Sequence, residues 1–596
     1  MKQRQRVFID NVQLSSDWHY PLGTSWLTAE LRAKGHDVLQ RYSHILAVEH
    51  VLRTYGGQAA EDALKVFRDP TRTIQDLYNA RITLNRVSEA IPDYDRFVVG
   101  RNNVYPVPGY DGTIEALLER VRTPERSVWY SYFREVEIPL ITEYRPNICA
   151  FSISDERQLP AGFMIAGMVK KALPETLVVL GGNFFARMKH TFKLPAFAQL
   201  FDFCDAIVHS EGFQPLVALA ETLDPSTTPG VVWRKKNRVI VKRKPKHPTS
   251  FEDLPTPHFD GGATPWCPDR VFPLYTMSRC PHECSYCSIY MGTDDNKKRG
   301  KGEKMQIRFM SPKRIAEHMA ALAPSGGRFD FVDETFSVAR QLALGAYLRK
   351  INHEAEWQCY TTITSDMLDP ELCKKLHEAG CRAVQLGLES LSKKTLVQEN
   401  KKWNAPAHYP VILRNLRDAG IQVHVFIMVG IPGENVCDTL RWLPFIKDHG
   451  APLMTLQASR YRLAREAPEE WDKKKRSPLI EMLPDTKPLR LNRDFKYKNE
   501  GGRSKQKDVE AALTLLDEAR RRHHLYPLGS TLPWWANRGR HTRSELEAMA
   551  EMLPQELEVA HLADALKRAG SIVEAEIGRK VRFGNFDEAV DFFRTI

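Results

Sequence analysis

The chain has 596 residues, 85 of them basic and 74 acidic, which gives a formal net charge of +11. This length predicts more than one domain, and 42% apolar with 27% charged residues is the usual balance of a globular protein. We expect no membrane span, because no apolar run reaches the ~18–20 residues that one needs, and no nucleic-acid partner, because the excess of basic residues is modest.

The number of cysteines indicates the cellular compartment in which the protein is expected. Ten cysteines in a chain of this length do not make a disulfide framework. The first residues lead directly into an apolar strand rather than into the core of a signal peptide. We therefore expect a reducing compartment, the cytoplasm.

The first 250 residues alternate between predicted strands and helices. Strands are expected at residues 6–11, 38–45, 146–154, 176–180 and 205–212, and helices at 22–34 and 161–173. This alternation predicts a parallel, doubly wound, Rossmann-like sheet, in which ligands bind at the carboxyl ends of the strands. Residues 46–140 have mixed helical character and are predicted to be an insertion or subdomain without assigned chemistry. The candidate ligand contacts at the strand ends are Ser152, Ser154, Gly181, Gly182, Ser210, Glu211 and Gly212.

A basic hairpin and a proline-rich linker are expected next. Residues 231–244 read as the hairpin, and four prolines follow between residues 245 and 257. Prolines at this density make a stiff linker. We expect a domain boundary near residues 250–265.

Three cysteines follow a strand-like run at residues 271–277, with the spacing C-x3-C-x2-C. They are Cys280, Cys284 and Cys287. Three thiolates on one tight loop can hold three irons of a [4Fe–4S] cluster, which leaves the fourth iron open. A closed zinc site would need a fourth ligand, for which His282 is the nearest candidate. Three cysteines packed in a core are the other alternative, although the polar and turn-forming residues between them are unlike a core strand.

The part of the chain after the cysteine loop predicts a partial TIM-like (β/α)6 barrel. Further strands are expected at residues 329–336, 357–363, 383–390, 423–430 and 452–459. Acidic, serine and glycine residues end these strands, and a helix follows each of them. In such barrels the site lies at the carboxyl ends of the strands.

Beyond about residue 480 the chain is predicted to be mainly helical. Residues 508–524 carry an apolar stripe at helical spacing. The basic residues at 520–524 are interpreted as the cationic end of that helix, with an anion-binding clamp as the alternative. Trp534 and Trp535 are expected to line a substrate pocket or to cap the barrel.

The cysteine loop resembles the signature loop of the radical S-adenosylmethionine (SAM) superfamily, including the aromatic Tyr286 before the third cysteine. The resemblance implies that the open iron binds SAM, whose reductive cleavage gives a 5'-deoxyadenosyl radical. It also implies SAM contacts at the strand ends of the barrel, including a G-x-E-S motif and a loop beside the adenine. These contacts are Tyr286, Asp333, Glu334, Glu389, Ser390, Gly430 and Pro432.

The strand ends of the first domain resemble a cobalamin-binding pattern, S-x-L followed after 26 to 28 residues by G-G. Here Ser152-Ile153-Ser154 is followed by 26 residues and then Gly181-Gly182, with serine in place of the leucine. Glycines would let the backbone lie against the flat dimethylbenzimidazole tail, or they simply turn a strand into a loop. The segment Asp17–Gly23 is one residue longer than the family motif D-x-H-x-x-G, so we expect the lower face of cobalt to be open rather than ligated by His19.

The two motif sets occur in the order found in cobalamin-dependent radical SAM enzymes, which the chain resembles over residues 1 to about 470. The resemblance implies a [4Fe–4S] cluster, SAM and cobalamin, and an electron donor of the flavodoxin or ferredoxin type. It implies methyl transfer from SAM via methylcobalamin to an unactivated carbon of a natural-product, peptide or lipid substrate, with two SAM molecules consumed per turnover. A radical rearrangement or cyclisation without methyl transfer is the alternative, and a cofactor-sensing protein is the rival that the intact cysteine loop argues against. The expected domains are 1–250 for cobalamin, 265–475 for the radical SAM barrel and 480–596 for a mostly helical region.

Overall fold

A computed structural model describes the chain from residue 4 to residue 595. The ranges outside the description are 13–20, 70, 93–94, 100–103, 107–110, 244, 246–248, 261–270, 290–306, 452, 454, 473–474, 499–504, 524 and 526–558. The chain forms two compact units, and both are discontinuous in sequence. One comprises Met1–Ser278, Met291–Leu322 and Asp485–Leu491, and the other Arg279–Tyr290, Ala323–Pro484 and Asn492–Ile596. The three-domain division remains a prediction.

The first unit contains a seven-stranded sheet with the order β2-β1-β5-β6-β7-β8-β9. The first five strands pair in parallel, and the last two form an antiparallel hairpin at one edge. The strands are β1 (Arg6–Asn11), β2 (Asp37–Arg41), β5 (Ile148–Ser152), β6 (Leu177–Gly181), β7 (Ala206–Val208), β8 (Val231–Lys235) and β9 (Arg238–Val241). The predicted parallel sheet is therefore confirmed, and so is the hairpin.

Helices cover both faces of this sheet. Successive side chains of a strand point to opposite faces, so neighbouring residues belong to different cores. Val7 and Ile9 of β1 share a core with residues of α1 (Leu22–Ala33) and α9 (Phe213–Thr222). Phe8, between them, belongs to a second core that includes residues of α7 (Leu159–Ala172) and α2 (Ser43–Arg68). The sheet is doubly wound, as predicted.

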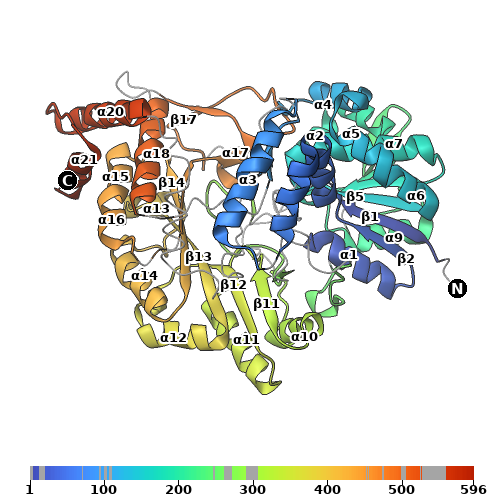
Figure 1. Ribbon diagram of the computed structural model, residues 1–596, viewed down its shortest axis with the longest axis horizontal. Coiled ribbons are helices and arrows are strands. Elements are labelled where there is room, and N and C mark those ends of the chain that lie inside the picture. Colours follow the sequence, from blue (N-terminus) through green and yellow to red (C-terminus); the bar gives the residue numbers. More distant parts are fainter. Residues whose placement is uncertain are drawn as a thin grey trace. The chain divides into compact units, whose positions relative to one another are not determined.

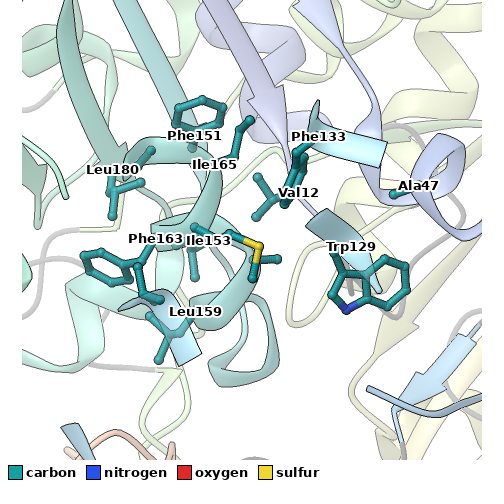
Figure 2. Close-up of a cluster of buried hydrophobic side chains, with 14 of the residues drawn as sticks. Val12, Ala47, Trp129, Phe133, Phe151, Ile153, Leu159, Phe163, Ile165 and Leu180 are labelled. Atoms are coloured by element: carbon teal, nitrogen blue, oxygen red, sulfur yellow. The ribbon is translucent and has the colours of Figure 1, made fainter. Parts of the chain in front are cut away.

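The region predicted as an insertion packs into this second core rather than forming a core of its own. It contains α2, α3 (Ile74–Glu89), α4 (Ile114–Arg122) and α6 (Ile138–Tyr144). Figure 2 shows Ala47, Trp129 and Phe133 from this region among Val12, Phe151, Ile153 and Leu180 from the sheet and its loops. The region thus supports the face of the sheet that α7 also covers.

One predicted strand of the first unit includes the start of a helix. Residues 38–45 were expected as strand, but β2 ends at Arg41 and α2 begins at Ser43. The Asp10 carboxylate accepts a hydrogen bond from the Ser43 backbone N–H at 2.9 Å and another from its hydroxyl. A carboxylate at this position satisfies one of the free N–H groups of a helix start, so the apolar residues that follow enter a helix.

The second sheet has six strands in the order β10-β11-β12-β13-β14-β15, and β11 to β15 pair in parallel. The strands are β10 (Val271–Leu274), β11 (Gly327–Phe331), β12 (Ala355–Thr361), β13 (Cys381–Glu389), β14 (Gln422–Val429) and β15 (Thr455–Arg460). The main intervening helices are α10 (Pro312–Leu322), α11 (Val338–Lys350), α12 (Pro370–Ala379), α13 (Lys393–Gln398), α14 (Tyr409–Asp418), α15 (Val436–Leu440) and α16 (Trp442–His449). Figure 1 shows β11, β12 and β13 side by side. The strand order and the helices between strands confirm the partial barrel.

The C-terminal region is mainly helical where it is described. Its helices are α18 (Lys505–Arg522), α20 (Val559–Ile577) and α21 (Phe586–Thr595), and α18 packs against β15, α15 and α16. At the end of α18, Arg521 and Arg522 pair with Glu518, and the interpretation of this basic run as the cationic end of the helix stays a prediction. Trp534 and Trp535 lie outside the described residues. Among the described helices, none has both the length and the hydrophobicity of a membrane span.

Candidate active site

The three cysteines lie on a loop whose backbone turns toward their sulfurs. The backbone N–H groups of His282 and Ile289 donate to the sulfurs of Cys280 and Cys287, each at 3.5 Å. Burial raises the pKa of Cys280 to about 12, and the thiols of Cys284 and Cys287 add to that shift. The three thiol groups therefore interact electrostatically.

A segment after α13, residues 399–404, holds this loop from one side, and we call it the bracing segment. The backbone N–H of Ser285 donates to the carbonyl of Glu399 at 3.3 Å, and the two side chains also share a hydrogen bond. The Asn400 side chain donates to the carbonyl of Glu283 at 2.8 Å. The sequence pattern gave no signal for these contacts, since the partners lie more than 100 residues apart.

His282 belongs to the same set of contacts. Its ring stacks on Trp403 of the bracing segment, with centroids 4.0 Å apart and planes at 28°. Its Nε2 lies 2.9 Å from the Thr362 hydroxyl, which in turn lies 2.9 Å from that of Thr335. Burial lowers the pKa of His282 to about 4, so the ring is neutral at neutral pH. The structure thus gives His282 a supporting role within the loop.

Glu389 and Ser390 stand at the end of β13, at an irregularity of the sheet. The register with β14 shifts between Gly387 and Glu389, and Glu389 has a φ of +65°. Its carboxylate accepts from Lys401 Nζ at 2.6 Å and from the Tyr286 hydroxyl at 3.4 Å. Two predicted SAM contacts, Tyr286 and Glu389, therefore meet.

Lys401 was not predicted. It is 9% exposed, and burial lowers its pKa, but the Glu389 carboxylate and the thiols of Cys284 and Cys287 outweigh that effect and leave the pKa raised. The ammonium group is therefore a buried positive charge beside the cysteine loop.

The loop after β14 carries the predicted residues Gly430 and Pro432. Gly430 has a φ of +86°, which favours glycine, and its carbonyl accepts from the Tyr497 hydroxyl at 2.6 Å. Lys505 Nζ, at the start of α18, donates to the carbonyls of Ile431 and Glu434 at 3.1 Å each. Elements from the C-terminal region thus fix this loop.

The same loop is tied to the end of β13. The Ser390 hydroxyl donates to the Glu434 carboxylate, whose pKa burial raises to about 7. The predicted SAM contacts at these two strand ends are therefore joined directly.

The two acidic residues after β11, Asp333 and Glu334, interact with different groups. Asp333 is fully buried, and its charge interacts with the Arg340 guanidinium of α11. Glu334 is half-buried and contributes to the raised pKa of Cys280. The charge of Glu334 therefore reaches the cysteine loop.

In the first unit, the predicted cobalamin contacts follow the carboxyl ends of three adjacent strands, β5, β6 and β7. Ser152 pairs in register with Gly181. The Ser154 hydroxyl donates to the side-chain carbonyl of Gln158 at 3.0 Å. Ser210 and Gly212 follow β7. The sheet therefore brings these residues to one edge, while Asp17 and His19 lie outside the described residues.

The two glycines of the G-G pair have different reasons to be glycine. Gly182 has a φ of +106°, and a Cβ there would overlap the backbone of Ile153. A Cβ at Gly181 would meet Val208 only at an ordinary 3.5 Å. Packing within the protein explains Gly182, whereas Gly181 leaves a bare stretch of backbone of the kind that a flat ligand can contact.

Glu211 has a partner within the first unit. Its carboxylate pairs with the guanidinium of Arg308, which also donates to the carbonyl of Thr249 at 2.5 Å. The backbone of Arg308 bonds with Ser278, two residues before Cys280, in both directions. This chain of contacts links the end of β7 to the strand that enters the cysteine loop, and the predicted cofactor contact of Glu211 stays a prediction.

Residues 274–445 match the model of the radical SAM superfamily. The barrel is a radical SAM domain. The chain is 24% identical over 310 residues to an uncharacterized methyltransferase of Pyrococcus horikoshii, a match that covers 50% of this chain and 62% of that protein. It is 26% identical over 160 residues to bacteriochlorophyllide d C-8(2)-methyltransferase of Chlorobaculum tepidum, covering 26% and 34% of the two chains.

Two solved structures share the fold over nearly the whole chain. One is the cobalamin-dependent SAM radical enzyme OxsB with aqua-cobalamin and SAM bound, with a TM-score of 0.58, 10% identity, and 99% of this chain and 78% of that chain covered. The other is the radical SAM methyltransferase TsrM from Kitasatospora setae with cobalamin and a [4Fe–4S] cluster bound, with a TM-score of 0.53, 13% identity, and 96% and 100% covered. The radical SAM domain and the doubly wound sheet therefore occur together in a known architecture.

The cysteine loop of the radical SAM domain has the donor set that an iron–sulfur cluster needs. Among the described residues, no group of three His, Cys, Asp or Glu side chains is placed to hold one metal ion. A cubane cluster does not require such convergence, because each thiolate ligates a different iron. The three half-buried thiols of one loop fit that chemistry.

Proposed function

We propose that the protein is a cobalamin-dependent radical SAM methyltransferase that moves a methyl group from SAM to an unactivated carbon of a natural-product, peptide or lipid substrate. The observation that carries the proposal is that one chain holds both a radical SAM domain with the three-cysteine loop and a doubly wound sheet with serines and glycines at adjacent strand ends. The nearly full-length likeness to two cobalamin-containing structures supports it.

The residues of the chain divide among three cofactors. Cys280, Cys284 and Cys287 would ligate the cluster. SAM would contact Tyr286, Asp333, Glu334, Glu389, Ser390, Gly430 and Pro432. Cobalamin would contact Ser152, Ser154, Gly181, Gly182, Ser210, Glu211 and Gly212. When bound, the cluster and SAM would supply a 5'-deoxyadenosyl radical, and cobalamin would carry the methyl group.

The protein's own part in this chemistry is binding and placement. Glu389 is a carboxylate held by Lys401 and Tyr286, so it can accept hydrogen bonds from a cationic amino group in a fixed direction. Gly430 and Pro432 sit on a loop fixed by Tyr497 and Gln398, which donates to the Pro432 carbonyl at 2.8 Å. Fixed donors and acceptors hold a reactive group in one position at little entropic cost.

The proposal includes an electron donor of the flavodoxin or ferredoxin type, because reductive cleavage of SAM consumes an electron. It also includes two SAM molecules per turnover, one as the methyl source and one as the radical source. Radical rearrangement or cyclisation without methyl transfer is the second candidate. It is kept because the same fold occurs in OxsB, a cobalamin-dependent SAM radical enzyme.

Anaerobic turnover with candidate substrates tests the proposal. The reconstituted protein, SAM, cobalamin and a reductant are incubated with each substrate. S-adenosylhomocysteine, 5'-deoxyadenosine and methylated product are then counted. Equal yields of all three support methyl transfer, and deoxyadenosine with a rearranged, unmethylated product would establish the second candidate.

A further inference from the structure

The sheet of the radical SAM domain carries polar side chains whose buried atoms have no hydrogen-bond partner. They come from β12, β14 and β15. The atoms are Nε2 of Gln358, Oε1 of Gln422, Nε2 of His424 and Oε1 of Gln457. Gln358 is 2% and His424 3% exposed, so solvent does not hydrogen-bond to these two side chains.

These side chains share one face of the sheet. Gln358 pairs in register with Ala383, and Ala383 with Gln422. Two residues further along β14, His424 pairs with Gln385, and Phe426 pairs with Gln457 of β15. Residues paired in register point to the same side, and so do residues two apart on one strand.

The opposite face belongs to the helices. Trp357, next to Gln358, donates its indole N–H to Gln341 of α11 at 3.2 Å. Val423 and Val425, on either side of His424, are fully buried, and α14 packs against β14. The polar side chains therefore face away from the helices, toward the inside of the barrel, and we call them the interior polar face.

The interior polar face combines uncharged hydrogen-bonding groups with a flat apolar surface. The rings of Tyr360 and Phe426 stack with centroids 5.9 Å apart and planes at 18°. His424 contacts the Phe426 ring edge-on at 4.3 Å, and its Nδ1 bonds with Thr455. Burial lowers the pKa of His424 to about 3, so its ring carries no charge at neutral pH.

Two charged side chains adjoin this face. Asp330 of β11 pairs in register with Gln358, and Glu389 at the end of β13 is neutralised by Lys401. A carboxylate beside Gln358 disfavours an anionic ligand. An ammonium ligand is disfavoured as well, because it offers donors only and so cannot accept a hydrogen bond from the Gln358 side-chain N–H.

Buried amide and imidazole atoms are costly unless a partner reaches them. The partner must offer both a donor and an acceptor, because Gln358 presents an N–H and Gln457 a carbonyl oxygen. It must also be flat enough to lie against aromatic rings. We propose that the interior polar face binds an uncharged amide group of the substrate, between Gln358, His424 and Gln457.

This inference rests on the proposed function only in that it takes the ligand to be the substrate. A peptide backbone and a free carboxamide share this chemistry. The peripheral carboxamides of a corrin share it too. The experiment therefore separates secondary amides, primary amides and cobalamin.

Saturation-transfer NMR on the anaerobic full-length protein measures binding without turnover, so it stays informative if methyl transfer is never observed. The probes are N-methylacetamide, acetamide, acetate and methylammonium. We expect at least one amide to bind and both ions to fail, with N-methylacetamide the stronger for a peptide substrate and acetamide for a free carboxamide. Signals from the two ions as strong as those from the amides would overturn the proposal, and so would the absence of a signal from both amides.

Variants locate the site. Gln457→Leu and His424→Phe should weaken amide binding at least tenfold, whereas Gln199→Leu, an exposed control in the first unit, should not change it. His424→Gln keeps a hydrogen-bonding group and should restore most of the binding if His424→Phe folds poorly. Unchanged binding in Gln457→Leu would show that the amide sits elsewhere. Loss of amide binding once hydroxocobalamin is added would assign the face to the corrin and overturn the substrate assignment.

Discussion

The ammonium group of Lys401 lies 2.6 Å from Oε1 of Glu389, and each side chain is only 11% exposed. The pair joins the bracing segment to the end of β13, beside the cysteine loop. Because both charges are buried, each depends on the other: removing one partner of such a pair leaves an uncompensated charge, at a cost of about 3–5 kcal/mol.

We therefore expect Lys401→Met to lower the free energy of unfolding by about 3 kcal/mol or more. Glu389→Gln in the same chain should recover much of the loss, because the unpaired carboxylate is then removed. Urea unfolding under anaerobic conditions of both single variants and the double variant measures the coupling. Additive losses in the double variant would mean that the two side chains act independently.

The cysteine loop gives the second prediction. Replacing Cys280, Cys284 and Cys287 together by alanine should reduce bound iron after reconstitution to background. Cys373→Ala, which removes a buried thiol on α12 outside the loop, is the control and should keep the wild-type iron content. Iron analysis with Mössbauer spectra decides, and a wild-type cluster in the triple variant would show that other ligands hold it.

The third prediction concerns pH. Burial, together with the neighbouring Glu469 and Glu434, raises the pKa of Glu399 from 4.5 to about 8, although its bond with Ser285 opposes the shift. Between these values the folded protein keeps a proton that the unfolded chain has lost, so this group makes stability fall as pH rises from about 4.5 to about 8. Glu399→Gln keeps an acceptor for Ser285 and removes the titration.

The variant should therefore gain stability relative to the wild type across that window and show a constant difference above it. Urea unfolding at several pH values from 5 to 9 measures the difference. A difference that does not change with pH would mean that the Glu399 carboxyl titrates normally.

The two glycines of the G-G pair give the fourth prediction. Gly182→Ala should destabilise the protein by about 1–3 kcal/mol, because alanine is strained at a φ of +106° and its Cβ would overlap Ile153. Gly181→Ala should leave stability nearly unchanged and weaken cobalamin binding instead. Thermal unfolding and a cobalamin titration followed by absorbance separate the two effects. Wild-type cobalamin affinity in Gly181→Ala would remove this glycine from the proposed site.

The cysteine loop and most strands were predictable from the sequence, because the spacing of the cysteines and the apolar pattern of a strand are each contained within a few residues. The support of that loop was not predictable. Ser285 and Glu399 are 114 residues apart, and nothing in the segment around Glu399 distinguishes it from an ordinary helix end. Which residues meet across that distance depends on the register of β13 and on the turn after α13.

The interior polar face was missed for a different reason. Gln358 and His424 alternate with apolar residues, and alternation in a strand usually means that the polar side faces solvent. In a closed or nearly closed barrel that side is buried too, so the same pattern indicates a polar interior. The exposure of a strand face follows from the curvature of the whole sheet, which no single strand encodes.

The discontinuity of the first unit restricts how the gene could be recombined. A fragment cut within the proline-rich linker would lose Leu489, which is 1% exposed in the core of the doubly wound sheet and whose backbone N–H bonds to the carbonyl of Gly112 at 2.9 Å. It would also lose Arg308, the partner of Glu211. Chimaeras with related enzymes should therefore transfer Met291–Leu322 and Asp485–Leu491 together with the N-terminal half. Without these segments, the transferred unit would lack part of its own core.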